Sequence, residues 1–366
     1  MLLEGQKLVH MKNEFLLGSK LIGDDQKPYF IADIAANHDG ELDRAKLLIE
    51  LAAKSGAHAA KFQHFRASKI VSKKGFFELG RKFSHQESWD KDVYDVYKDA
   101  ELPWEWTEKL ATHAKDFGID FFTAPYDLEA IDHVEPFICA FKVGSGDIDW
   151  LEEIEYMALR KKPIIIATGA STLEEVDNAV AVVDKHNIPL ILMQCNTNYT
   201  GKMDNLSHIN LKVLKQYEER YSNIVLGLSD HTPGHISVLG AIALGARVIE
   251  KHFTDDDTRV GPDHGFSLNP ALWKEMVRSS NLLFESLGDG LKKVESNETE
   301  SVIIQRRAVR FARNLAAGST ISREDLIPLR PAPKGSFKPN EMKLIIGKKL
   351  KIDVRADELV LRTQIE

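Results

Sequence analysis

Eight short apolar segments, each followed by a longer amphipathic or polar stretch, constrain the fold of this chain more than any other feature. The segments lie at residues 29–35, 57–65, 119–125, 139–146, 163–170, 190–196, 224–231 and 246–253. Between them apolar residues recur three and four positions apart, as in LDRAKLLIELAAKSG (42–56), which is the period of an amphipathic helix. Eight strand–helix repeats within roughly 250 residues predict a TIM-type (β/α)₈ barrel of the α/β class. A doubly wound open sheet is the alternative, but no GxGxxG motif follows a strand to favour it.

Three parts of the 366-residue chain depart from this repeat. Residues 66–102, after the second segment, form an aromatic-rich insertion that we expect to be an active-site cover or an interface arm. A polar stretch without periodicity, residues 287–303, is expected to link the barrel domain (1–286) to a separate C-terminal module. Short β-like runs and turn residues predict that this module, at 304–366, is compact and β-rich. A module this small would be only marginally stable by itself, which favours its docking on a barrel.

The net charge of −7 is unevenly distributed along the chain. Residues 302–366 carry 14 Lys and Arg against 7 Asp and Glu, which leaves 34 against 48 for the rest. Either the opposite charges help the two parts or two subunits associate, or the basic tail brings positive charge to an anionic substrate. Nucleic-acid binding is less favoured, because the basic residues are not interleaved with aromatic ones.

The N-terminus and the cysteines indicate a cytoplasmic protein. The first 20 residues lack the continuous apolar region of a secretory signal, and the longest apolar runs are of strand length, too short to span a membrane. The only cysteines, Cys139 and Cys195, fall in or at the end of apolar runs, where a reduced thiol behaves as a small hydrophobe. They exclude a disulfide framework and a cysteine-rich zinc site.

Polar residues in the apolar segments are the candidates for function, because the carboxyl ends of barrel strands carry the chemistry in this fold. Lys61 and Lys142 are costly to bury unless each meets an anion. Either each pairs with a local carboxylate, or both belong to a phosphate or carboxylate site beside the Gly144–Asp147 turn. Asp33, inside the first segment, poses the same choice between pairing with Lys61 and facing an active site.

Two histidines are candidates for binding a metal ion. His231 and His252 lie 21 residues apart at the ends of the last two segments, and Glu250 shares the strand face of His252. Two imidazoles with oxygen donors suit Mn²⁺, Zn²⁺, Fe²⁺ or Co²⁺ better than Ca²⁺. Hydrogen-bonded core histidines are the alternative.

Taken together, these motifs resemble those of the sialic acid (N-acetylneuraminate) synthase family. The motifs are NHDG, KFQ, FKVGSGD, ATG, GLSDHT, EKHFT, GPDH and, in the tail, LRPAPKG with IGKKL. The resemblance runs from about residue 20 to the C-terminus, and the tail is similar to the antifreeze-like (SAF) module of these enzymes. It implies a transferase that condenses phosphoenolpyruvate with N-acetylmannosamine or a related amino sugar and releases phosphate.

The resemblance also implies roles for individual residues. The residues that match catalytic positions are Asp33, Lys61 and Lys142. Those that match phosphoenolpyruvate-binding positions are Lys61, Thr123, Lys142, Ser145 and Ser229. Those that match positions around the acceptor sugar are Gln63, Asp147, Tyr199, Asp263 and Arg330. His231 and His252 match ligands of a divalent ion, Mn²⁺ first, with Mg²⁺ or Co²⁺ as alternatives.

The resemblance implies a domain-swapped homodimer as well, because Arg330 matches an arginine that the tail of one subunit places in the barrel of the other. No nucleic acid or membrane is expected as a partner.

The chain departs from the family pattern in two places, and both bear on the acceptor. Asp33 stands where glutamate is usual, and Asn196–Tyr199 differs from the common sequence after the sixth segment. The sugar is therefore left open between N-acetylmannosamine and the diamino-dideoxy hexoses that give legionaminic or pseudaminic acid. The alternative functions are a synthase of another 3-deoxy sugar acid of the Kdo-phosphate or DAHP type, a Schiff-base aldolase using Lys61 or Lys142, and a non-catalytic sugar- or ice-binding protein.

Overall fold

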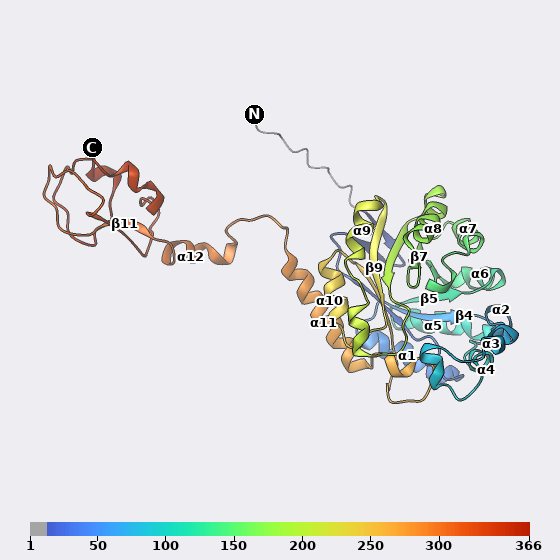
Figure 1. Cartoon of the computed structure of the whole chain (residues 1–366). Coiled ribbons are helices and arrows are strands. Elements are labelled where there is room, and N and C mark those ends of the chain that lie inside the picture. Colours follow the sequence, from blue (N-terminus) through green and yellow to red (C-terminus); the bar gives the residue numbers. More distant parts are fainter. Residues whose placement is uncertain (1–12) are drawn as a thin grey trace. The chain divides into compact units, whose positions relative to one another are not determined.

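The computed structural model of the chain describes residues 13–366 (Figure 1). Residues 1–12, which hold much of the segment in which we find no secretory signal, lie outside the described residues. The chain divides into two compact units, of which the first ends at Gly288 and the second is Asp289–Glu366. Within residues 13–366, no helix has both the length and the apolar character needed to cross a membrane.

The first unit is built on one sheet of eight parallel strands. They are β3 (Tyr29–Asp33), β4 (Ala59–His64), β5 (Asp120–Pro125), β6 (Phe141–Val143), β7 (Ile164–Ala167), β8 (Leu190–Cys195), β9 (Ile224–Asp230) and β10 (Val248–His252). Their order is β5-β4-β3-β10-β9-β8-β7-β6, and β5 packs beside β6, so the sheet curls into a nearly closed barrel. The predicted (β/α)₈ barrel is confirmed, and each predicted segment contains one strand.

A helix follows every strand and covers the outside of the barrel (Figure 1). The helices are α1 (Leu42–Lys54), α5 (Thr107–Asp116), α6 (Leu128–Val134), α7 (Leu151–Ala158), α8 (Leu173–Lys185), α9 (Val213–Arg220), α10 (Ile236–Ala243) and α11 (Pro270–Leu287). Gly56 and Gly118 follow the ends of α1 and α5 with φ of 91° and 72°, a left-handed conformation that glycine adopts at little cost. Thr172 caps α8 in a capping box with Glu175.

Side chains alternate between the two sides of each strand, and this alternation builds two separate cores. On β3, Phe30 and Ala32 face outward into the core beneath the helices. Tyr29 and Ile31 face inward, where they pack with the N-terminal hairpin of β1 (Glu14–Leu17) and β2 (Lys20–Gly23). Asp33 is the next inward position after Ile31. The amino ends of the strands therefore fill the barrel with apolar side chains, and the carboxyl ends present polar ones.

The insertion after β4 is folded into short helices. It contains α2 (Ala67–Ile70), α3 (Lys73–Glu78), a 3₁₀ turn (Ser84–Ser88) and α4 (Val93–Asp99). Its position after β4, at the end of the barrel that carries the chemistry in this fold, makes it available as a wall for a site there.

The second unit has its own small core. α12 (Thr299–Ile304) precedes an antiparallel pair of strands, β11 (Ala308–Phe311) and β12 (Leu326–Leu329). The core is formed by side chains of both strands and of the turns between and after them, such as Val309, Phe311, Phe337 and Ile345. The β-rich module predicted after the barrel is confirmed. α12 falls largely in the stretch 287–303, whose sequence shows no helical period.

Candidate active site

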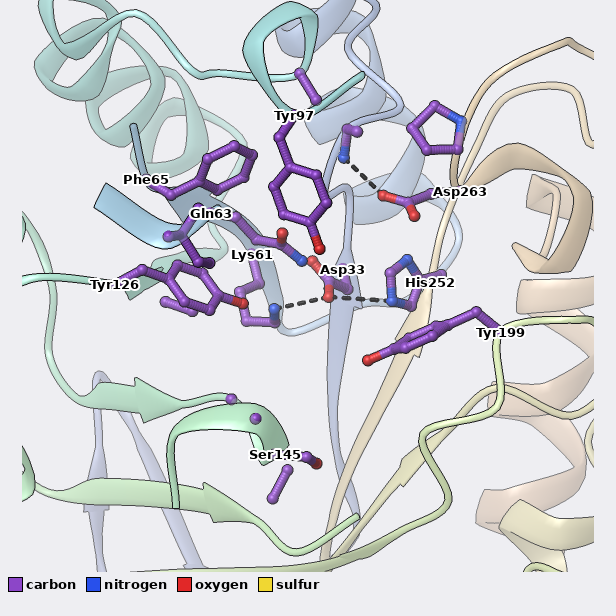
Figure 2. A pocket seen from close by; sticks show the side chains of 18 of the residues that line it. Asp33, Lys61, Gln63, Phe65, Tyr97, Tyr126, Ser145, Tyr199, His252 and Asp263 are labelled. Carbon is purple, nitrogen blue, oxygen red and sulfur yellow. Dashed lines mark hydrogen bonds and ion pairs between the residues drawn. The ribbon is translucent and has the colours of Figure 1, made fainter. Parts of the chain in front are cut away.

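A cavity of about 400 Å³ lies at the carboxyl ends of the barrel strands (Figure 2). Eleven of the predicted site residues line it: Asp33, Lys61, Gln63, Lys142, Ser145, Asp147, Tyr199, Ser229, His231, His252 and Asp263. They come from six of the eight strands or the loops that follow them. The fold thus brings together residues that are up to 230 positions apart in the sequence.

Two lysines and two carboxylates form the floor of this pocket. Lys61 Nζ lies 2.7 Å from Asp33 Oδ2 and 3.9 Å from Glu250 Oε1. Lys142 Nζ lies 3.6 Å from Glu250 Oε1, and all four side chains are buried. Burial alone would lower the pKa of Lys61, but Asp33 and Glu250 outweigh it and raise that pKa. Lys61 is therefore a charged ammonium group at neutral pH, positioned to bind an anion.

Asp33 satisfies both hypotheses raised by its position in the first strand. Its Oδ2 pairs with Lys61, and its Oδ1 accepts a hydrogen bond of 3.1 Å from the backbone N–H of Ala35. His252 Nε2 lies 3.4 Å from Asp33 Oδ2. Because the same carboxylate also lines the pocket, it holds the end of the barrel together and faces the site.

The turn after β6 approaches the end of β7 closely. Ser145 Oγ accepts a hydrogen bond of 3.0 Å from the backbone N–H of Gly169. A side chain at Gly169 would come within 3.1 Å of Ser145 Oγ and Cys195 Sγ, so glycine is required for this approach. Ser229 donates a hydrogen bond of 3.3 Å to Glu250 on the neighbouring strand. Two hydroxyl groups thus line the same pocket as the two lysines, and together these groups are a suitable donor set for an oxygen-rich anion.

The two histidines lie side by side, with ring centroids 5.3 Å apart. Burial lowers the pKa of both imidazoles, so both are neutral at pH 7 and can bind a metal ion. His231 Nδ1 lies 3.0 Å from the carbonyl of Asn196, which makes Nδ1 the protonated nitrogen and leaves Nε2 its lone pair. In the described part of the chain, His252 Nδ1 and Glu250 Oε2 have no hydrogen-bond partner although both are buried.

These groups fit a divalent ion held by two protein nitrogens. The described residues contain no cluster of three or more His, Cys, Asp or Glu side chains arranged for a metal. A metal ion here would therefore take most of its other ligands from water or substrate, as an ion that binds a reacting group must.

Two further carboxylates line the pocket. Asp263 Oδ2 accepts a hydrogen bond of 3.0 Å from the backbone N–H of Ala36, and burial raises the pKa of Asp263 to about 6. Burial, with the nearby Asp149, raises the pKa of Asp147 to about 6 as well. Tyr199 packs edge-on against His231, with 4.4 Å between ring centroids.

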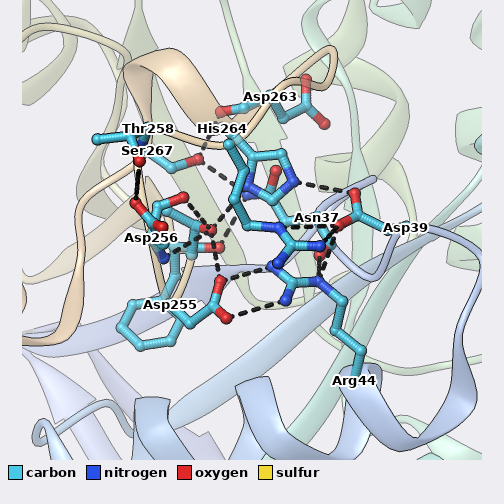
Figure 3. Close-up of polar contacts among 12 residues, drawn as sticks. Asn37, Asp39, Arg44, Asp255, Asp256, Thr258, Asp263, His264 and Ser267 are labelled. Atoms are coloured by element: carbon cyan, nitrogen blue, oxygen red, sulfur yellow. Dashed lines mark hydrogen bonds and ion pairs between the residues drawn. The ribbon is translucent and has the colours of Figure 1, made fainter.

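A buried polar network fixes the loop that carries Asp263 (Figure 3). His264 is fully buried, and its Nε2 lies 2.9 Å from Asp39 Oδ1. Arg44 binds Asp255 through two hydrogen bonds of 2.9 and 2.5 Å, and its Nε lies 3.0 Å from Asp39 Oδ2. The NHDG turn after β3 and the loop after β10 are thereby joined, which determines where Asp263 projects into the pocket.

Two predicted site residues do not lie in this pocket. Thr123 is fully buried, and its hydroxyl lies 2.7 Å from His64 Nδ1, on the face of β5 that meets the helices. Its side chain faces away from the cavity, because Thr123 pairs with the outward-facing Phe62 of β4, and its role in binding phosphoenolpyruvate stays a prediction. Arg330 belongs to the second unit, where its Nε donates to the carbonyl of Gln305 over 2.6 Å, and its role in a barrel site stays a prediction.

The structure adds aromatic residues that the motifs did not indicate. Tyr97 and Trp89, from the insertion, line the pocket together with Phe65 and Tyr126. Part of the insertion therefore forms a wall of the pocket, and its role as an active-site cover or an interface arm stays a prediction. The aromatic content of the insertion was the available signal, but no periodicity shows which of its aromatic residues turn inward.

A (β/α)₈ barrel with paired lysines, carboxylates and two neutral histidines in one pocket defines an enzyme that acts on an anionic, oxygen-rich substrate. Comparison with known proteins names the family. The model of the NeuB family matches residues 48–292, and that of the SAF domain matches residues 306–366. The chain belongs to the NeuB family.

The chain is similar to named synthases over nearly the whole length of each of them. The N,N'-diacetyllegionaminic acid synthase of Legionella pneumophila is 34% identical, over 97% of this chain and 99% of that protein. The human N-acetylneuraminate-9-phosphate synthase is 28% identical, over 96% of each chain. The crystal structure of the N-acetylneuraminic acid synthetase from Leptospira borgpetersenii, in complex with citrate, is similar with a TM-score of 0.71 and 27% identity, over 80% of this chain and 96% of that one. The protein is an enzyme of sialic-type acid synthesis.

Proposed function

We propose that the enzyme condenses phosphoenolpyruvate with an amino sugar, N-acetylmannosamine or a related diamino-deoxy hexose, to a nonulosonic acid, releasing phosphate with the help of a divalent ion. The observation that carries this proposal is the pair of buried lysines beside two neutral histidines in one cavity. The relatives named above are synthases of acids of this class. The reaction belongs to biosynthesis, and we expect it in the cytoplasm.

The floor of the pocket is suited to phosphoenolpyruvate. Its phosphate and carboxylate would meet the ammonium groups of Lys61 and Lys142 and the hydroxyls of Ser145 and Ser229. These donors are already in place, held by Asp33 and Glu250 or by backbone groups, so little reorganisation is needed when charge develops.

His231 and His252 would hold the divalent ion, with Mn²⁺ first and Mg²⁺ or Co²⁺ as alternatives. When bound, such an ion supplies Lewis-acid polarisation of the aldehyde of the open-chain sugar. Gln63, Asp147, Tyr199 and Asp263, which also line the pocket, would orient that sugar through hydrogen bonds.

The reaction forms one carbon–carbon bond, from C3 of phosphoenolpyruvate to the aldehyde carbon of the sugar. C2 then carries positive character, which the neighbouring carboxylates Asp33 and Glu250 stabilise. Water adds at C2, a carboxylate accepts its proton, and inorganic phosphate leaves.

The state of Lys61 argues against a Schiff-base aldolase. A lysine that attacks a carbonyl needs a lowered pKa, whereas the carboxylates around Lys61 raise its pKa. The SAF domain argues for a sialic-type synthase over a synthase of another 3-deoxy sugar acid.

The direct test is incubation of the enzyme with phosphoenolpyruvate, Mn²⁺ and a panel of amino sugars, with phosphate release and product mass as readouts. We expect phosphate release that requires both the sugar and the metal. Borohydride-trapped adducts with pyruvate, without phosphate release for any sugar, would support the aldolase instead.

We also propose a homodimer in which Arg330 of one subunit completes the barrel site of the other. The opposite net charges of residues 302–366 and of the rest of the chain support this arrangement. Mixing Arg330→Ala protein with Lys61→Ala protein should restore part of the activity in heterodimers. No recovery after demonstrated subunit exchange would contradict the proposal.

A further inference from the structure

We propose that Thr107 is a positioning residue for the reaction: its buried hydroxyl fastens the insertion (66–102) to the barrel and so places the insertion's part of the pocket wall. This inference rests on the proposed condensation with phosphoenolpyruvate. Thr107 is the first residue of α5, shortly after the insertion ends, and it is fully buried. It does not line the cavity, so it can act only through the residues that it holds.

Three polar groups converge on the Thr107 hydroxyl. Its Oγ1 lies 2.7 Å from Nε2 of His64 and 2.9 Å from Nε2 of His133, and it donates a hydrogen bond of 2.8 Å to the backbone carbonyl of Trp104. A hydroxyl group has one proton to donate and two lone pairs that accept. Because the proton goes to the carbonyl, which can only accept, both imidazoles donate an Nε2–H to Thr107. The hydroxyl is therefore saturated, and each histidine carries a proton on Nε2.

The network continues through His64 to the barrel sheet. Burial, with the nearby His133, lowers the pKa of His64 to about 3, so this imidazole is neutral at pH 7. With its proton on Nε2, His64 accepts at Nδ1, which lies 2.7 Å from Oγ1 of Thr123 on β5. Thr123 thus donates to His64 and His64 donates to Thr107, and all three side chains are fully buried. This directed chain of hydrogen bonds joins β4, β5 and the start of α5 on the side away from the cavity.

Both ends of the insertion are tied to this network. At the start, the guanidinium carbon of Arg66 lies 4.0 Å from the ring centroid of Trp104. Trp104 in turn stacks on His133, with 4.6 Å between ring centroids. The backbone N–H of Ala67 donates a hydrogen bond of 2.6 Å to Glu101, near the end of the insertion. The two ends are thereby held to each other and to the residues around Thr107.

The base of the insertion bears directly on the pocket. His64 stands between Gln63 and Phe65, which both line the cavity. Phe65 packs against Tyr97 of the insertion, with 5.5 Å between ring centroids. A misplacement of about 1 Å in such a wall can lower a reaction rate roughly a hundredfold. The two lysines that would bind phosphoenolpyruvate are fixed by strand pairing within the sheet, so a loosened base should affect the sugar more than the donor.

The test replaces Thr107 by valine, which keeps its shape but not its hydroxyl, and by serine, which keeps the hydroxyl. Thr107→Val leaves two imidazole N–H groups and one carbonyl without their partner. At saturating Mn²⁺, the KM for the sugar should rise about tenfold or more, while the KM for phosphoenolpyruvate should stay within about twofold of the wild type. Thr107→Ser should keep both KM values within about threefold.

Limited trypsin digestion of the folded protein reports on the same base without any substrate. Lys73, Lys74 and Arg81 are exposed on the insertion. Because proteolysis follows the population of locally opened states, cleavage after these residues should be about tenfold faster in Thr107→Val than in the wild type or in Thr107→Ser.

Thr168→Val is the matched control. The buried Thr168 hydroxyl also bridges two groups, the carbonyl of Met193 and the hydroxyl of Tyr217, each at 3.0 Å. These partners lie on β8 and α9, outside the insertion. Thr168→Val should therefore unfold at a lower urea concentration, but without faster cleavage of the insertion and without a selective rise in the KM for the sugar.

A wild-type KM for the sugar, or a wild-type cleavage rate, in folded Thr107→Val would overturn this inference and leave the proposed condensation intact. An equal rise in both KM values would overturn it as well. Should Thr107→Val fail to fold, Arg66→Ala changes a partly exposed side chain of the same base and should give the same selective effect. Absence of phosphate release by the wild type with every sugar would overturn the condensation and, with it, the positioning role.

Discussion

Two buried aspartate–lysine pairs in the same barrel allow the role of Asp33 to be separated from simple stabilisation. Asp33 and Lys61 lie on β3 and β4, with 2.7 Å between Oδ2 and Nζ, and face the pocket. Asp230 and Lys251 lie on β9 and β10, with 2.6 Å between Oδ2 and Nζ, and are fully buried outside the pocket. Replacing each aspartate by asparagine removes one charge from a similar pair in two different places.

The stability cost should be larger at Asp230. In Asp230→Asn, Lys251 keeps the carbonyl of Thr232 but loses its paired carboxylate, which leaves an uncompensated buried charge. Such a change costs about 3–5 kcal/mol, or roughly a hundredfold or more in the unfolding constant. In Asp33→Asn, Lys61 retains Glu250 at 3.9 Å and faces a cavity, so the cost should be about 1–3 kcal/mol.

The effect on turnover should have the opposite order. Asp33→Asn should lower kcat/KM about a hundredfold or more, because it removes a pocket carboxylate that the proposed mechanism uses to stabilise C2 of phosphoenolpyruvate. Asp33→Glu, which keeps the charge, should retain substantial activity. Asp230→Asn, assayed below its melting temperature, should stay within a few-fold of the wild type.

The assays are urea unfolding followed by circular dichroism and phosphate release from phosphoenolpyruvate with the preferred sugar. Wild-type rates in folded Asp33→Asn would show that this carboxylate only holds the barrel together. An Asp230→Asn protein as stable as the wild type would refute the account of the buried pairs.

Three further predictions concern histidines. His231→Ala and His252→Ala should each weaken Mn²⁺ binding at least about tenfold in calorimetry without substrate, and unchanged affinity would remove that residue from the metal site. His264→Asn breaks the contact with Asp39 that holds the loop carrying Asp263. The KM for the sugar should therefore rise about tenfold, while the KM for phosphoenolpyruvate stays constant. Equal changes in both KM values would contradict a role of His264 in positioning Asp263. Burial lowers the pKa of His64 to about 3 in the folded protein. The unfolded chain therefore binds a proton at a higher pH than the folded protein does, so the free energy of unfolding should fall as the pH drops from about 6.5 toward 3. Between pH 7 and 5 the free energy of unfolding, measured with urea, should fall by about 2 kcal/mol. If it falls equally with pH in His64→Gln, His64 is not the source of this dependence.

Much of the barrel could be predicted because its signals are local. A strand of this fold is a short apolar run, and its helix repeats apolar residues at three and four positions, so each unit is visible in one stretch of sequence. The polar residues at the strand ends were equally visible, since a lysine such as Lys61 inside an apolar run is conspicuous. The period of two along a strand also makes it possible to place Glu250 and His252 on one face.

Thr123 shows what a motif match leaves undetermined. Residues at a strand end alternate between pocket and helix layer, and assignment to one or the other depends on register with the neighbouring strand. Thr123 pairs with Phe62, which faces the helices, and its hydroxyl bonds to His64 instead of lining the cavity. A motif match carried no information about this direction.

The sequence by itself determined the (β/α)₈ class, the C-terminal module and most of the residues that meet in the pocket, because strand and helix periods are written locally along the chain. Only the tertiary structure decided that Asp33 both pairs with Lys61 and faces the cavity, and that Glu250 lies near both lysines. It also decided that Tyr97 reaches the site from the insertion. These relations join side chains far apart in sequence, and their distances depend on strand register, barrel closure and loop packing, none of which is encoded in a local pattern.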